Sequence, residues 1–102
     1  MISQSVPPTK ILNIANRVLN KLVRKRFGNH ITIRINSLQF LSNHNLICNS
    51  FVPEINLKSS KRVSLEELNT IDIFLKNQLN IILKMTETNV LRDIVKIRIL
   101  VN

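Results

Sequence analysis

The chain has 102 residues, of which 44% are hydrophobic and 21% are charged. This length suits one small domain with its own hydrophobic core, and one Gly, three Pro and one Cys exclude collagen-like, low-complexity and disulfide-stapled chains. Fifteen Lys and Arg against six Asp and Glu give a formal net charge of +9. The partner we expect is therefore a polyanion, either nucleic acid or an anionic membrane.

No targeting or membrane-spanning segment is expected. The first eight residues, MISQSVPP, lack the basic and apolar regions of a signal peptide, and no apolar run is long enough to cross a bilayer. Cys48 has no second thiol to pair with in the chain, which suits a reducing compartment. We expect a bacterial cytoplasm, or the stroma or matrix of an organelle. The many Asn and Ile residues are typical of an AT-rich genome, which fits either setting.

The charge is distributed unevenly along the chain. Residues 1–53 hold seven cations and no acid, a formal charge of +7, whereas the remainder holds eight cations and six acids. An acid-free half that also carries a folding pattern indicates a surface that faces a polyanion.

A helix is predicted over residues 9–27. Thr9 is placed to cap its start and Gly28 to end it. Apolar residues recur at three- and four-residue steps and form one face, namely Ile11, Ala15, Val18, Leu19, Leu22 and Val23. The opposite face is a stripe about 100° wide that contains only cations and amides, namely Lys10, Asn13, Arg17, Asn20, Lys21 and Arg24.

Two strands are predicted next, because the period changes from 3.6 to 2. The first covers residues 31–40, with a bulge at residues 36–37 where the alternation shifts by one residue. After a turn at residues 43–45, the second strand covers residues 46–58. Pro53 interrupts it, which indicates an edge strand or a bulged one.

A second helix is predicted from a capping box formed by Ser64 and Glu67. Its apolar stripe runs through Leu68, and helical spacing continues to about Met85. Residues 81–85 form a short apolar run that also fits a strand, so both assignments stay open at this point.

A last strand is predicted over residues 95–101, with Lys96 and Arg98 on a basic outer face. The order α-β-β-α-β predicts an α+β fold, in which a hairpin and a β-α-β crossover give a three-stranded sheet with both helices on one face. The other face would be open. We expect residues 1–8 to be an N-terminal extension and residues 9–102 to be a single domain.

Catalysis is not expected, and neither is a cofactor, a metal or a small-molecule substrate. A single Gly excludes a Gly-rich phosphate loop and a nucleophile elbow. His30, His44 and Cys48 do not stand at zinc-ligand spacing. Glu66 and Glu67 are more simply explained as acids that complement the dipole at a helix start.

Binding of nucleic acid through cations is the mode that the composition favours. The chain has no Tyr or Trp, and its four Phe residues fall at or near core positions, so base stacking on exposed rings is disfavoured. A simpler interpretation is a solvated basic face without a ligand, which the absence of acids from residues 1–53 argues against. The predicted RNA-binding residues are Lys10, Arg17, Lys21, Arg24, Lys25, Arg26, Arg34, Lys96 and Arg98.

The order of elements resembles the type II KH arrangement, and short motifs resemble the ribosome-binding factor A family of small basic proteins. These motifs are Arg17-Val18, the run from Ile35 to Phe40, Asn45-Leu46, Leu68-Asn69, Phe74-Leu75-Lys76 and the run from Leu91 to Ile99. The chain has Ile71 and Ile73 where the family has the Ala and Gly of a helix kink, and Val95 where the family has Pro. The resemblance implies a KH-like domain that binds ribosomal RNA during maturation of the small ribosomal subunit.

Two other classes of protein also explain small size and basicity. One is a small structural subunit of an organellar ribosome or of another large assembly. The other is a peripheral module that lays its first helix on an anionic membrane. Against the membrane module, the apolar face of that helix lacks Trp and is needed for the core.

Overall fold

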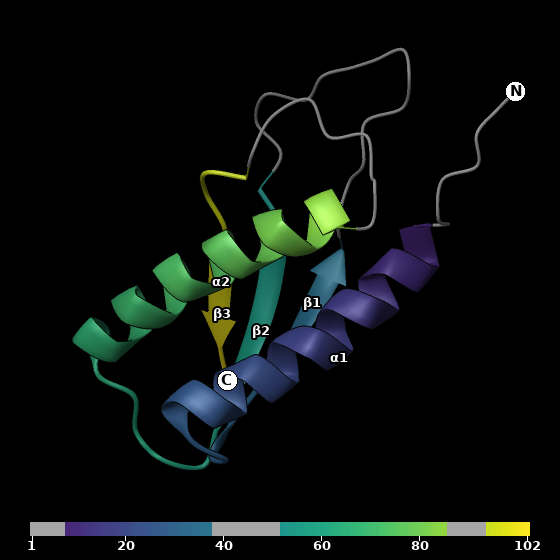
Figure 1. Ribbon diagram of the computed structural model, residues 1–102. Coiled ribbons are helices and arrows are strands. Elements are labelled where there is room, and N and C mark those ends of the chain that lie inside the picture. Colours follow the sequence, from purple (N-terminus) through teal and green to yellow (C-terminus); the bar gives the residue numbers. More distant parts are fainter. Residues whose placement is uncertain (1–7, 38–51, 86–93) are drawn as a thin grey trace, which may run out of the picture.

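Two helices cover one face of a three-stranded sheet in the computed structural model of the chain (Figure 1). The structure describes residues 8–37, 52–85 and 94–102. In chain order the elements are α1 (Pro8–Phe27), β1 (Ile31–Ser37), β2 (Glu54–Ser59), α2 (Leu65–Met85) and β3 (Arg98–Val101). The predicted α+β fold and its α-β-β-α-β order are confirmed.

Gly28 ends α1 and turns the chain into β1. Its φ is 123°, in the region that L side chains rarely adopt. A Cβ atom at this position would lie 2.7 Å from Nδ1 of His30. The Gly28 N–H donates to the carbonyl of Arg24 at 3.0 Å, which satisfies one of the last carbonyls of the helix. The core side of α1 is a row of buried residues four apart: Ile11, Ala15, Leu19 and Val23.

The sheet is mixed, with strand order β1-β2-β3. β1 pairs with β2 in antiparallel register, and β2 pairs with β3 in parallel register. The register shifts between Ile35 and Ser37, which confirms the bulge expected at residues 36–37. The strand expected over residues 46–58 begins at Glu54 in the structure. Its earlier part, together with the continuation of β1 and the turn at residues 43–45, lies outside the described residues.

Pro53 stands immediately before β2, and β2 is the central strand, so its interpretation as an edge strand is wrong. Pro53 is fully buried, and its carbonyl accepts from the N–H of Arg98 at 2.9 Å. It has no N–H to donate to the carbonyl of Lys96, which the parallel register would require. The hydrogen bonds between β2 and β3 therefore start at Arg98. β3 begins three residues later than the start predicted at Val95.

α2 is a continuous helix through residues 81–85. Of the two assignments left open for that run, the helix is therefore correct and the strand is not. The N–H of Glu67 donates to Oγ of Ser64 at 3.1 Å, so Ser64 caps the helix as predicted. The buried residues continue the helical period to the last turn: Ile71, Leu75, Leu79, Ile82 and Leu83.

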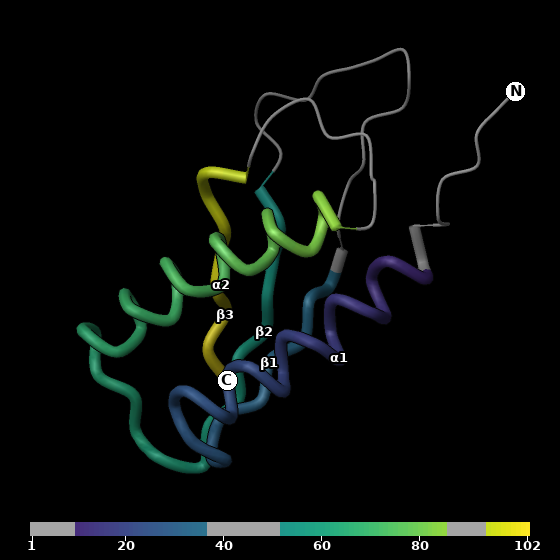
Figure 2. Tube along the Cα trace, in the orientation of Figure 1, coloured from purple at the N-terminus to yellow at the C-terminus, as the bar shows by residue number. Residues whose placement is uncertain are grey.

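The core lies between the helices and the covered face of the sheet. Figure 2 shows α1 running beside β1, with α2 on the side of β3. The strands contribute their alternate residues to it, namely Ile31, Ile33, Ile35, Ile55 and Leu57, and Ile97 adds to it from the segment immediately before β3. Within the ranges that the structure describes, neither helix has the length and apolarity needed to cross a membrane.

Two asparagine side chains of α1 close the outer edge of β1. Asn20 accepts the N–H of Ile33 at 2.8 Å and donates to the carbonyl of the same residue at 2.7 Å. Asn16 pairs with Ile35 in the same way, at 2.7 Å and 3.4 Å. Each primary amide thus presents a donor and an acceptor to one residue, as a neighbouring strand would. We call this pair the asparagine clamp.

Asn80 of α2 makes a third contact of this kind. It accepts the N–H of Ile94 at 2.7 Å and donates to its carbonyl at 2.9 Å. The chain that leads into β3 is thereby held against α2. Val95, immediately after it, is 80% exposed instead of lying on the inner face that the alternation predicts.

Replacement of Asn20 by Ala should destabilise the fold, because it leaves the N–H and the carbonyl of Ile33 without their partner at a half-buried site. We expect a loss of about 1–3 kcal/mol in the free energy of unfolding, measured by urea titration. Asn13 is the matched control, since it is an exposed Asn of the same helix. Asn13→Ala should be neutral or slightly stabilising, because Ala is the better helix former. Equal losses in both variants would contradict the role of the clamp.

Candidate nucleic-acid interface

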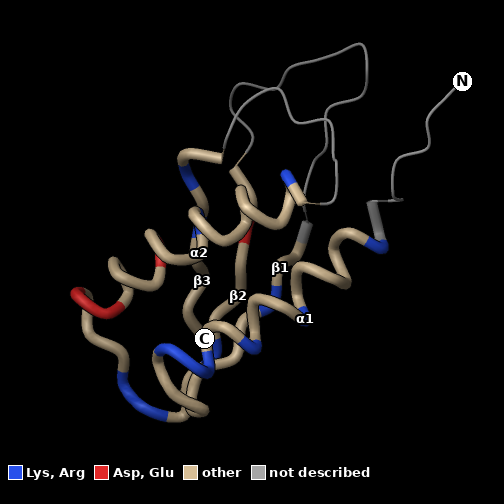
Figure 3. The backbone as a smooth tube through the Cα atoms, viewed as in Figure 1, with Lys and Arg blue, Asp and Glu red and all other residues tan. Residues whose placement is uncertain are grey.

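The asparagine clamp fixes the rotation of α1 about its axis and hence the direction of its cations. With Ile11, Ala15, Leu19 and Val23 in the core, the remaining arc of the helix faces solvent. The exposed cations on that arc are Lys10, Arg17, Lys21 and Arg24, and we call them the α1 stripe. Figure 3 shows Lys and Arg along α1, with Asp and Glu confined to other elements.

Asn20 does not belong to this open stripe, contrary to the sequence-based prediction. Its side chain is half-buried, and both of its amide functions are used on the sheet. Asn20 lies between the buried row and the cations on the helix circumference. The amide that was expected on the exposed stripe therefore binds the sheet and orients the cations beside it.

Arg24 connects α1 to the open face of the sheet. Its Nη2 donates to Oγ1 of Thr32 at 3.2 Å. Thr32 is exposed, and it alternates along β1 with the buried Ile31 and Ile33, so it lies on the face that the helices leave open. The α1 stripe is therefore continuous, across the edge of β1, with the open face.

The open face adds two exposed cations, Arg34 on β1 and Lys58 on β2. Arg34 was predicted. Lys58 was not, although the alternation of β2 around the buried Ile55 and Leu57 places Lys58 on the outer face. The sequence alone did not show that β2 lies beside β1, and this pairing brings the two cations onto one surface.

Arg98 also lies on the outer side of its strand, where it forms an ion pair. Its Nη1 is 3.2 Å from Oε2 of Glu54, the residue opposite it in the register of β2 and β3. Its positive charge is partly neutralised there. Lys96 is exposed in the segment that precedes β3, outside the strand on which it was predicted.

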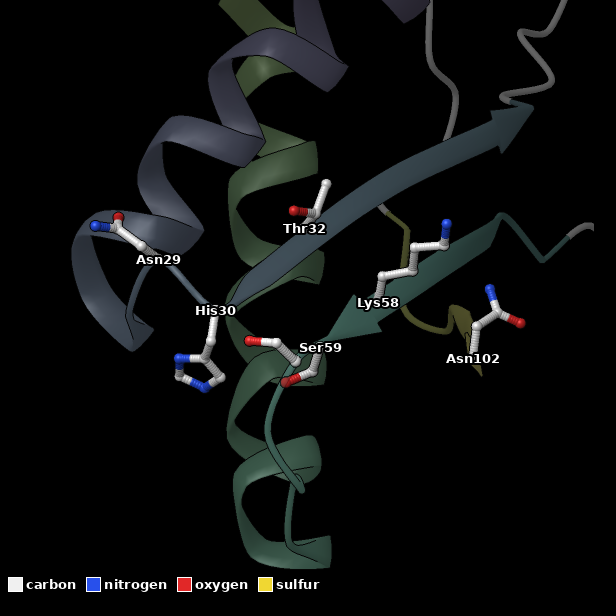
Figure 4. A pocket seen from close by; sticks show the side chains of 7 residues that line it. Asn29, His30, Thr32, Lys58, Ser59 and Asn102 are labelled. Atoms are coloured by element: carbon white, nitrogen blue, oxygen red, sulfur yellow. The ribbon is translucent and has the colours of Figure 1, made fainter.

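A hollow of about 490 Å³, lined by residues with polar side chains, lies where the open face meets the turn after α1 (Figure 4). Thr32 and Lys58 reach it from adjacent strands, and none of the described residues that line it is acidic. The Ser59 hydroxyl is engaged with the backbone of Lys61, at 3.1 Å and 2.6 Å. The remaining groups offer N–H and O–H donors suited to phosphate oxygens. The full lining is Asn29, His30, Thr32, Lys58, Ser59, Ser60 and Asn102.

Arg26 has a different environment from the α1 stripe. Its guanidinium carbon is 5.5 Å from the centroid of the Phe27 ring and 5.4 Å from that of Phe74. These two rings pack edge to face, with centroids 5.5 Å apart, and they join the end of α1 to α2. Arg26 is two residues, about 200° around the helix, from Arg24. It covers an interhelical aromatic contact, whereas Lys25 is exposed in the same turn.

No family model, curated protein or solved structure matches the chain. Across residues 8–37, 52–85 and 94–102, there is no group of three or more His, Cys, Asp or Glu side chains that could hold a metal ion. The site is therefore defined by the geometry and charge of the chain itself.

Arg26→Gln should lower the free energy of unfolding by about 0.5–1 kcal/mol, because it removes the cation over the rings of Phe27 and Phe74. Lys25→Gln is the control, since it removes one charge from the same last turn of α1 and so matches the effect on the helix dipole. Urea titration of both variants measures the difference. A loss no larger in Arg26→Gln than in Lys25→Gln would rule out the ring contact as its cause.

Proposed function

We propose that the protein is a non-catalytic RNA-binding protein that acts in the maturation of the small ribosomal subunit. The α1 stripe and the open face of the sheet form its RNA-binding surface. The observation that carries this proposal is the set of exposed cations on that surface, Lys10, Arg17, Lys21 and Arg24 on α1 with Arg34 and Lys58 on the open face. The narrower assignment to ribosomal RNA rests on the motifs that resemble the ribosome-binding factor A family.

Binding would proceed by contact with phosphates. The stripe on α1 and the pair Arg34 and Lys58 lie on either side of the edge of β1, so a phosphate backbone that follows this edge meets cations from both directions. Each neutralised phosphate releases counterions, which gives affinity that is largely independent of sequence. Phe27 and Phe74 are partly buried against each other, so they do not offer a platform for bases. Selectivity would come from the shape of the RNA.

The affinity for structured RNA should therefore fall steeply with salt. If about four phosphates are neutralised, a plot of log K against log salt concentration has a slope near −3. Fluorescence anisotropy with a fragment of small-subunit ribosomal RNA, titrated between about 0.05 and 0.2 M salt, measures this slope. A slope near zero would exclude the electrostatic mechanism.

Reversal of three charges on the α1 stripe tests the location of the surface. The triple variant Arg17→Glu, Lys21→Glu, Arg24→Glu should bind RNA roughly 100-fold more weakly in 0.1 M salt, because three phosphate contacts are lost and repulsion is added. All three side chains are exposed, so we expect an unchanged circular dichroism spectrum.

The matched control changes the net charge equally at other positions. Lys61→Glu, Arg62→Glu and Lys76→Glu lie in the loop before α2 and on α2 itself, where Lys76 is 3.3 Å from Asp72. This variant should lose much less affinity than the α1 variant. Equal losses would mean that only total charge matters, and a loss confined to the control would move the RNA-binding surface to α2.

Crosslinking in the native cell, followed by sequencing of the bound RNA, tests the ribosomal assignment. An assembly factor should be enriched on precursor RNA of the small subunit and depleted from mature subunits. Full occupancy on mature ribosomes would instead identify a structural subunit of the assembly.

A further inference from the structure

The two outer edges of the sheet differ. The edge of β1 is closed by the asparagine clamp, and the chain before β3 is closed at Ile94 by Asn80. β3 itself follows, and it is the other outer strand of the sheet. A strand in this position presents a row of backbone donors and acceptors that can pair with another chain.

The hydrogen bonds to β2 define which peptide groups of β3 point outward. The N–H groups of Arg98 and Asn102 donate to the carbonyls of Pro53 and Leu57, each at 2.9 Å. Because N–H and C=O directions alternate along a strand, the peptide groups of Ile99 and Val101 point away from β2. Among the described residues, these outward groups have no hydrogen-bond partner.

A groove lined by both apolar and polar side chains lies beside this free edge, on the side of α2. Its volume is about 310 Å³, and its lining is Leu65, Leu68, Asn69, Asp72, Ile99 and Val101. Leu65 is 84% exposed and Val101 is 52% exposed. The groove thus offers apolar contact to alternate side chains of a strand paired with β3.

Acidic side chains of α2 lie in the groove and in the hollow next to it. Asp72 lines the groove itself, and its carboxylate forms an ion pair with the ammonium group of Lys76 at 3.3 Å. Asn69 also lines a neighbouring hollow that contains Glu66 and Glu67. Three of the four acids in the described part of the chain are therefore on α2, two of them in its first turn, and the fourth, Glu54, is paired with Arg98.

We propose that β3 binds an extended segment of a basic partner protein, which adds as a fourth strand of the sheet. Its main chain pairs with the outward groups of Ile99 and Val101. Its apolar side chains enter the groove beside Leu65, and its Lys or Arg side chains face Glu66 and Glu67 in the first turn of α2. This interface lies at the outer edge of β3 and beside α2, whereas the cations of the proposed RNA-binding surface lie on α1, β1 and β2.

The experiment uses the full chain and a fluorescent eight-residue peptide of alternating Val and Lys. We expect the peptide to shift the amide NMR signals of Ile99 and Val101, and an otherwise identical Val and Glu peptide to bind at least tenfold more weakly. Shifts confined to other amides, or equal binding of the two peptides, would overturn the proposal.

Val101→Pro removes one outward N–H while leaving the ladder to β2 intact, since proline is tolerated where an edge N–H faces solvent. It should weaken peptide binding about fivefold to tenfold, whereas Val101→Thr keeps the N–H and should bind within about twofold of the original protein. Should Val101→Pro disturb the fold by circular dichroism, Leu65→Lys tests the groove instead and should also weaken binding.

Two further readouts separate the alternatives. RNA affinity should be unchanged in Val101→Pro, so failure of the strand proposal is distinguishable from failure of the RNA proposal. Analytical ultracentrifugation of the free protein should give a monomer. A dimer that Val101→Pro dissociates would show that a second copy occupies the edge, which would overturn the assignment to a basic partner.

Discussion

The asparagine clamp is the contact on which the arrangement of α1 and the sheet depends. Two primary amides of α1 take the positions that a strand would occupy beside β1, and they satisfy the N–H and carbonyl of Ile33 and Ile35. An outer strand without such partners would leave these groups to water or to another chain. Because Asn16 and Asn20 are one helical turn apart, they set both the direction and the rotation of α1. The buried row then meets the core and the α1 stripe faces solvent.

Most of the fold could be predicted from the sequence, because it follows from local periodicity. The buried row of α1, the stop at Gly28, the cap at Ser64 and the register shift after Ile35 are all features of neighbouring residues. The position of β2 in the sheet could not be predicted in this way. Pro53 is compatible with an edge strand or with the position just before a central strand. Only the pairing of β3 with β2 decides between the two.

The candidate site was less predictable, because it depends on which elements meet. The cations could be counted along the chain, but Arg24 joins the open face only because β1 brings Thr32 beside it. Arg26 differs from its neighbours because α2 supplies Phe74. In the sequence, Asn16 and Asn20 did not stand out from the many other Asn residues. Their pairing with the sheet depends on tertiary structure. A usable indication was present, since Asn is a poor helix former and both residues border the buried row one turn apart.

A sheet that is closed on one side and open on the other can be extended only once. Fibrils grow because every molecule has two free strand edges, one that joins the growing end and one that receives the next molecule. Here a strand that pairs with β3 uses the free edge of the described sheet, and the opposite edge already carries the amides of Asn16 and Asn20. Even two copies joined through β3 would form a closed pair, whose outer strands both end in asparagine side chains. Within the described sheet, the clamp thus occupies the edge that a further molecule would need.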